Sequence, residues 1–304
     1  MKKILLAFVL FLFAQSSFAQ SISIDSSFSG DGRVETGITP TESLSKFTTI
    51  QPNGKYILTG KIEPNASHCS MKRYYPDGTL DSTFQFNNTD LYIYAICLQD
   101  DGKIICATYN GLVRLHSNGQ LDTSFVTSQV TQLANYYHLE TRILSNGKIV
   151  SCGFKINPTN DGIYVAVFNP DGTPDTNFAQ SGIFKYHPTF IDLVFSLKTQ
   201  QDGKIVFSGC SMVDDEAFIT LYRLTDKGIL DADFGVNGVI LESLLGAGEG
   251  FEMDIQADGK IVVAGYLFTQ NSSKACVLRY LPNGTRDPDF GVNGVCIIPG
   301  ATTT

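Results

Sequence analysis

Two short runs of this 304-residue chain hold the residues best suited to binding or chemistry. Asp214-Asp215-Glu216 is the densest acidic run, and its carboxylates would suit Ca²⁺ or a cationic group. A run of this kind is also typical of a solvated loop. Tyr136-Tyr137-His138 would form an aromatic platform for a sugar or a peptide, or its rings would pack beneath a long loop. Both runs are therefore candidate binding residues, and no residue is assigned as catalytic.

The remaining reactive residues form no recognisable site. His68, His116, His138 and His187 have no zinc-like spacing. The many Asp-Gly and Asn-Gly pairs lack the alternating oxygen ligands of a calcium loop, and turn chemistry explains them better. We find neither a Gly-x-Ser-x-Gly elbow nor a phosphate-binding loop. The sequence predicts no metal and no cofactor, although distant loops can still assemble an enzyme site.

Seven cysteines are an odd number, and we expect most of them to be buried as small apolar residues. Cys97 and Cys106 flank Asp101-Gly102. A two-residue turn there would place the cysteines opposite each other, at the short end of disulfide geometry. A three-residue turn would shift the register by one and separate them. We expect the two cysteines to be adjacent, and the disulfide stays open.

A repeat underlies almost the whole chain. A Gly-Lys pair recurs with its glycine at Gly54, Gly102, Gly147, Gly203 and Gly259. An aspartate followed three residues later by phenylalanine recurs at Asp25, Asp81, Asp122, Asp175, Asp231 and Asp287. Between these markers lie short β-branched and aromatic runs bounded by turn residues, about four to a unit. A period of this size predicts an all-β solenoid or propeller.

The turns suggest why one arginine and one aspartate recur. Asn169-Pro170-Asp171-Gly172-Thr173 fits a type I turn closed by a left-handed glycine, because proline excludes a primed turn. With this three-residue loop, counting places Arg279 opposite Asp287. The same count pairs Arg73 with Asp81, Arg114 with Asp122 and Arg223 with Asp231. We therefore predict one structural cross-strand ion pair per unit; the third unit departs, with Val167 opposite Asp175.

The motifs Gln-x-Asp-Gly-Lys-Ile-Val, Leu-x-Arg and Leu-Asp-x-x-Phe-Gly-x-x-Gly carry a family resemblance. The pattern resembles the delta-60 repeat, a bacterial extracellular β-propeller repeat of undetermined function. The resemblance covers residues 24 to 298 and is weakest in the second unit, where Val126 follows Phe125. It implies an all-β propeller of about five four-stranded units and a secreted location. It transfers no catalytic residue.

The first residues predict export. Residues 1–19 read as a secretory signal peptide, with Lys2 and Lys3 before an apolar run and a small-x-small cleavage site at Ser17-Phe18-Ala19. The alternative is an uncleaved anchor. Residues 20–304 then form one propeller domain that is secreted, periplasmic or at the cell surface, with no membrane span after signal removal. The net charge of −8 and the lack of basic clusters argue against nucleic acid as a partner.

The number of blades in the ring has two interpretations. Ile24–Val34 reads as a spare fourth strand, which in propellers usually completes the last blade and removes an open edge. However, Gly294–Ile298 also supplies a fourth strand. Either five blades close with one redundant strand, or the chain is part of a larger ring.

Loop lengths vary on one side only, at the links after the second and fourth strands of each unit. Functional residues concentrate on loops that a rigid scaffold holds. We therefore expect an exported, non-enzymatic binding or scaffolding module whose partner is a protein, a glycan or a small ligand. One alternative is a polysaccharide hydrolase or lyase with Asp215 and Glu216 as acid and base. Another is a purely structural module of a surface protein.

Overall fold

The computed structural model describes residues 44–61, 70–87, 91–109, 111–126, 136–155, 162–186, 192–214, 216–242, 247–268 and 273–303. The predicted signal peptide, residues 1–19, and the predicted spare strand at Ile24–Val34 lie outside these ranges. Every regular element in the described ranges is a β-strand. No helix there is long and apolar enough to cross a membrane.

The strands form five antiparallel sheets, and we number the repeat units one to five in chain order. Unit one contains β1 (Leu44–Ile50), β2 (Tyr56–Lys61) and β3 (Ser70–Tyr74). Unit two contains β4 (Ile93–Leu98), β5 (Ile104–Thr108) and β6 (Gly111–Leu115). Unit three contains β7 (Tyr137–Ile143), β8 (Ile149–Phe154), β9 (Ile163–Phe168) and β10 (Ile183–Tyr186). Unit four contains β11 (Asp192–Thr199), β12 (Ile205–Val213), β13 (Glu216–Leu224) and β14 (Val239–Leu241). Unit five contains β15 (Gly248–Ile255), β16 (Ile261–Phe268), β17 (Ser273–Tyr280) and β18 (Val295–Thr303).

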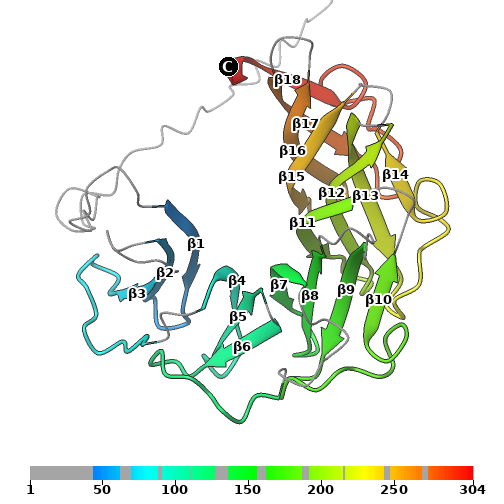
Figure 1. Ribbon diagram of the computed structural model, residues 1–304. Helices are drawn as coiled ribbons and strands as arrows, with labels where there is room; N and C mark the ends of the chain where they lie inside the picture. Colours follow the sequence, from blue (N-terminus) through cyan, green and yellow to red (C-terminus); the bar gives the residue numbers. More distant parts are fainter. Residues whose placement is uncertain are drawn as a thin grey trace, which may run out of the picture.

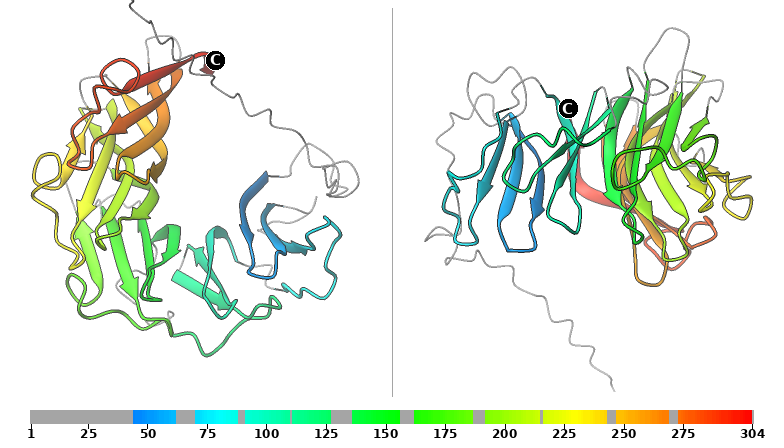
Figure 2. Two further views of the ribbon diagram at one scale, coloured as in Figure 1. Left: turned by 180° about the vertical axis from the view of Figure 1, so that it is seen from behind. Right: turned by 90° about the horizontal axis from the view of Figure 1, so that it is seen from below.

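The sheets are arranged as the blades of a propeller, so the predicted fold class is confirmed (Figure 1). The first strands of the units, β1, β4, β7, β11 and β15, line the inner side of an arc (Figures 1 and 2). Units three, four and five have the predicted four strands, whereas units one and two have three strands in the described residues. The sheets of units one and five stand at the two ends of the arc, and no strand of the described residues joins them (Figure 1).

The hydrophobic core lies between neighbouring sheets. All six residues of β8 and of β9 are buried, because the third sheet packs against a neighbour on each face. In β16 buried residues alternate with more exposed ones, since only one face of the fifth sheet packs against another blade. This is the period-two pattern of a strand with one covered face.

The hairpins use the predicted three-residue turns. Leu281 donates its N–H to the carbonyl of Thr285 at 2.7 Å, and Gly172 has φ of 93°, a left-handed value that favours glycine. The turn between β4 and β5 has the same form: the N–H of Gln99 donates to the carbonyl of Lys103 at 2.9 Å.

That turn corrects the expectation for the two cysteines. Because the loop has three residues, Cys97 pairs with Ile105 and Cys106 pairs with Ile96. Side chains one position apart point to opposite faces of a strand. The two cysteines therefore do not face each other, and both are free thiols.

The predicted Arg–Asp pairs are present in the structure and lie next to the following unit. The Nε of each arginine lies 2.7 to 2.9 Å from Oδ2 of its aspartate, in Arg73–Asp81, Arg114–Asp122, Arg223–Asp231 and Arg279–Asp287. In the first, second and fourth units Nη1 also donates to a carbonyl in the next unit's turn, at Ser117, Pro170 and Pro282. The ion pairs thus fasten neighbouring blades as well as one hairpin.

The phenylalanines of units one to four complete these junctions. Phe125 lies under the turn of the third unit, where a Cβ built on Gly172 would come 2.9 Å from its ring. The N–H of the next residue, Val126, donates to the carbonyl of Asp171 at 3.2 Å. The same packing joins Phe84 to Gly119, Phe178 to Gly228 and Phe234 to Gly284. Repeated aspartate, arginine and phenylalanine are therefore parts of one inter-blade contact.

Candidate binding face

The ends of the blades differ in their loops. The Gly-Lys and Pro-Asp-Gly turns lie at one end, which we call the constant face. The second strands end and the third strands begin at the opposite end, which we call the variable face. The first strand of each unit begins at the variable face and the second strand ends there, so residues at these two positions surround it.

A cluster of tyrosines occupies the variable face between units two and three. Tyr92 directly precedes β4 and Tyr94 is its second residue, whereas Tyr109 follows β5 and Tyr137 begins β7. Ring centroids are 4.8 Å apart for Tyr109 and Tyr137, 5.8 Å for Tyr94 and Tyr137, and 4.9 Å for Tyr92 and Tyr94. Tyr92 is 40 % exposed and Tyr109 is 37 % exposed. The blade junction thus presents amphipathic rings to solvent.

The three residues of the predicted aromatic run separate in the structure. Tyr137 belongs to the tyrosine cluster and also stacks on Phe154, with centroids 5.4 Å apart. Tyr136 is buried, with its ring edge against Tyr164 at 5.2 Å. His138 is buried too, and its Nδ1 shares a hydrogen bond of 2.5 Å with the Tyr164 hydroxyl. Burial lowers the pKa of His138 to about 3, so the ring is neutral near pH 7.

The acidic run lies at the turn between β12 and β13. Asp214 has φ of 49°, Glu216 is exposed at the first position of β13, and Asp215 lies outside the described residues. In the ranges that the structure describes, no group of three or more His, Cys, Asp or Glu side chains is placed to hold a metal ion.

The inner strands hold a charged cluster that sequence reasoning missed. Glu140, Ser196 and Glu252 occupy one repeat position, directly after a register shift in β7, β11 and β15. Ser196 donates to Oε1 of Glu252 at 2.9 Å, and Lys198 Nζ lies 3.1 Å from the same oxygen. The 56-residue spacing of the three positions was visible in the sequence, but their shared place on the inner rim depends on the bulge.

Glu140 is the most perturbed carboxyl of this inner cluster. It is 8 % exposed, and Arg142 Nε lies 3.3 Å from its Oε1. Burial raises the pKa of Glu140, the charge of Glu252 adds to the increase, and Arg142 and Lys198 oppose it. A buried carboxyl group with a raised pKa is a common feature of acid–base sites.

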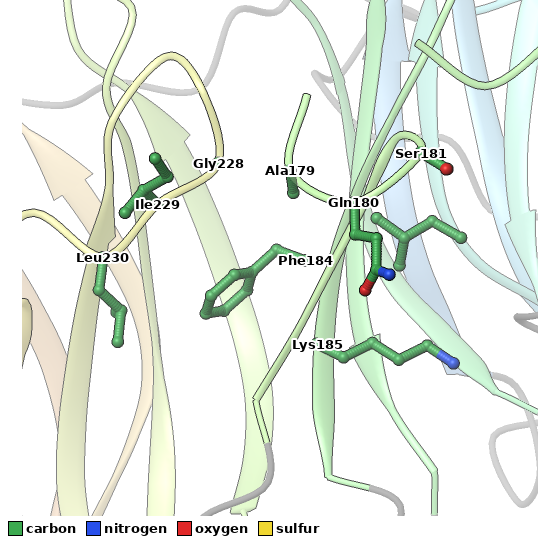
Figure 3. Close-up of a pocket in the computed structure, with 9 residues that line it drawn as sticks. Ala179, Gln180, Ser181, Phe184, Lys185, Gly228, Ile229 and Leu230 are labelled. Carbon is green, nitrogen blue, oxygen red and sulfur yellow. The ribbon is translucent and has the colours of Figure 1, made fainter. Parts of the chain in front are cut away.

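Two pockets open where units three and four meet. One, of about 700 Å³, is lined by Phe184 and Lys185 of β10 and by Gly228, Ile229 and Leu230 of the next unit (Figure 3). The ring of Phe184 faces the loop of Ile229 and Leu230, whereas Lys185 points away from it (Figure 3).

The other pocket has about 870 Å³ and lies on the constant face. Its wall includes Val167, Asp175 and Phe178 of unit three and Gln200 and Asp226 of unit four. None of these pocket residues was predicted as a binding residue, although the departure at Val167 was visible in the sequence.

The fold and the repeated contacts between neighbouring blades define a β-propeller built from sequence repeats. Residues 51–84, 99–125 and 256–290 match the family model "Domain of unknown function (DUF5122) beta-propeller". The resemblance to a propeller repeat of the delta-60 type is therefore confirmed. No curated protein matches the chain.

The chain is similar to several solved structures. A protein of unknown function from Dyadobacter fermentans is 11 % identical with a TM-score of 0.52, and the match covers 86 % of this chain and 84 % of that one. A gluconolactonase from Xanthomonas campestris is 11 % identical with a TM-score of 0.46, over 79 % and 74 % of the two chains. A polysaccharide lyase described as an ulvan lyase is 11 % identical with a TM-score of 0.48, over 80 % and 71 %. At 11 % identity, the similarity to the Dyadobacter fermentans protein shows the fold alone.

Proposed function

We propose that this protein is an exported, non-enzymatic binding module that holds a glycan on its variable face. The tyrosine cluster is the observation that carries the proposal, because Tyr92 and Tyr109 expose ring surface beside Tyr94 and Tyr137. Sugar rings present apolar C–H faces that pack against aromatic rings, while the phenol hydroxyls supply hydrogen bonds.

The position of the cluster supports a binding role. Its tyrosines come from β4, β7 and the end of β5, which belong to two blades that a buried core joins. Side chains on such a scaffold lose little conformational freedom when a ligand binds. The signal-peptide pattern of residues 1–19 supports export to a compartment where glycans are accessible.

A glycan array probed with the mature chain, residues 20–304, tests the proposal. The chain should retain a glycan, and both Tyr109→Ala and Tyr92→Ala should weaken its binding about tenfold or more. Tyr75→Ala is the matched control, since Tyr75 lies in a turn of the constant face and should leave binding unchanged. Failure to retain any glycan, or equal binding by all four proteins, would contradict the proposal.

A second candidate function is a polysaccharide hydrolase or lyase. The raised pKa of Glu140, to which the charge of Glu252 contributes, favours it, because a glycosidase needs one carboxyl group that stays protonated as the acid. The pair predicted from the sequence, Asp215 and Glu216, is the other version of this candidate. Incubating each retained glycan with the protein decides: cleavage that Glu140→Gln abolishes supports an enzyme, and intact glycan supports the binding module. The purely structural alternative predicts neither binding nor cleavage.

A further inference from the structure

The third unit lacks the arginine that the other four units carry and that contacts the next blade in units one, two and four. Arg114 shows what this side chain does. Its Nε lies 2.9 Å from Oδ2 of Asp122, its Nη1 donates to the carbonyl of Pro170 at 2.7 Å, and its guanidinium lies 4.6 Å from the centre of the Phe125 ring. Carboxylate, turn carbonyl and aromatic face together form a guanidinium site.

Unit three keeps the carboxylate, the phenylalanine and the neighbouring turn of this site, but it loses the arginine. It also has Leu144 where Gln51 and Gln99 accept from the arginine in units one and two. Val167 stands at the arginine position, and the N–H of Asp175 still donates to its carbonyl at 2.8 Å. Asp175 is 8 % exposed, and Phe178 is buried beneath the turn of unit four. Asp226 occupies the turn position at which, in the other junctions, the backbone carbonyl accepts a hydrogen bond from the arginine.

A pocket lies where the arginine would be. The constant-face pocket of about 870 Å³ is bounded by Val167, Asp175, Phe178 and Asp226. Gln200 also lines it, and its Oε1 is a buried acceptor without a hydrogen-bond partner. A buried acceptor without a partner costs free energy that a donor from a ligand would recover.

The lysine already bound to Asp175 does not exclude a second cation. Lys148 Nζ lies 2.6 Å from Oδ2 of Asp175. In unit four, Oδ2 of Asp231 accepts from both Lys204 at 3.0 Å and Arg223 at 2.8 Å. Units one and five repeat this double pairing at Asp81 and Asp287. Asp175 therefore has one of the two cations that this position takes in units one, four and five.

The geometry points to a binding site for a guanidinium group of a ligand, such as an arginine side chain of a peptide or a small guanidine. The group would pair with Asp175, donate to the turn at Asp226 and to Gln200, and stack on Phe178. An ammonium group would make the ion pair without the planar, multiple donation, so the site should prefer guanidinium. The site lies on the constant face, away from the tyrosine cluster, and does not depend on the proposed glycan binding.

Calorimetric titration of the mature chain with N-ethylguanidinium, ethylammonium and acetyl-Gly-Arg-Gly-amide tests the site. N-Ethylguanidinium should bind saturably. Ethylammonium should bind at least about tenfold more weakly. If the tripeptide binds more tightly than N-ethylguanidinium, the ligand is a peptide arginine; equal affinities indicate a small guanidine. Absence of saturable guanidinium binding would overturn the inference.

Three variants connect binding to the pocket. Val167→Arg supplies the missing side chain, so it should abolish N-ethylguanidinium binding and raise the melting temperature. Asp175→Asn should also abolish binding. Val167→Ala leaves the pocket open and should bind within about threefold of the parent, because it removes no polar partner. Undiminished binding by folded Val167→Arg would place the guanidinium elsewhere and refute the assignment.

Discussion

Arg223 and Asp231 face each other across the hairpin that ends unit four, with Nε 2.8 Å from Oδ2. Both side chains are buried, and the arginine also donates to the turn carbonyl of Pro282 in unit five. One ion pair therefore closes a hairpin within a blade and fixes the next blade against it. The repeat consists largely of the residues that make this contact.

Removing one member of this pair should cost more than removing both. Arg223→Ala leaves the Asp231 carboxylate with Lys204 alone, at a cost of about 2 kcal/mol, between the values typical of surface and buried pairs. The double variant Arg223→Ala/Asp231→Ala should lose less free energy of unfolding than either single variant, because it leaves no buried charge without its partner. Urea unfolding of the four proteins measures the coupling, and additive losses would contradict the pairing.

Acid should weaken the second junction within a defined pH range. Burial raises the pKa of Asp122, but hydrogen bonds from Ser124 and the charge and hydrogen bond of Arg114 outweigh it and lower that pKa to about 2. The unfolded value is about 3.9, so the carboxylate contributes stability above about pH 4 that is lost as the pH falls toward 2. Thermal unfolding of the parent should decline across this range more steeply than that of Asp122→Asn. Parallel profiles would show that Asp122 does not contribute.

Two glycines with similar backbone angles should tolerate alanine differently. Gly172 has φ of 93°, and an added Cβ would lie 2.9 Å from the Phe125 ring. Gly102 has φ of 80°, but its nearest neighbour would be 3.7 Å away. Gly102→Ala should cost about 1 kcal/mol from backbone strain alone. Gly172→Ala should cost about 1 to 3 kcal/mol more, because the ring must move. Equal melting temperatures for the two variants would contradict the junction packing.

The cysteines should be unbridged and should differ in reactivity. Burial raises the pKa of the Cys97 thiol to about 12 and also raises that of Cys106, whereas Cys296 is exposed. Without reductant, iodoacetamide should label Cys296 in the native protein at neutral pH, and Cys97 and Cys106 only after unfolding. Mass spectrometry of the labelled peptides reads this out, and a Cys97–Cys106 crosslink would refute the three-residue turn.

Local spacing was enough to predict much of the fold. The pairing of Arg279 with Asp287 follows from counting residues around one turn, and a left-handed Gly172 follows from its proline-containing turn. The predicted pairing of Cys97 with Cys106 was wrong because Asp101-Gly102 alone does not reveal whether Asp100 belongs to the loop. The sequence gives little indication of whether a loop has two or three residues. This difference of one residue turns every side chain of the strand to the opposite face.

Contacts between blades could not be predicted in the same way. The tyrosine cluster joins Tyr94 and Tyr109 of unit two to Tyr137 of unit three, through the mutual placement of two sheets. The grouping of Glu140 with Glu252 depends on bulges that have no marker residue in the sequence. The substitution at Val167 was visible, but the pocket beside it requires the position of the next blade.

The central claim is that the variable face is the binding face. Amide hydrogen exchange of the protein, measured with and without the glycan that it retains on the array, tests this claim most directly. Bound glycan should slow exchange in peptides covering residues 91–94, 108–112 and 136–138, which carry the tyrosine cluster. Peptides of the constant face, at residues 144–148 and 200–203, should exchange as in the free protein. Protection confined to those constant-face peptides, with none at the tyrosines, would contradict the account.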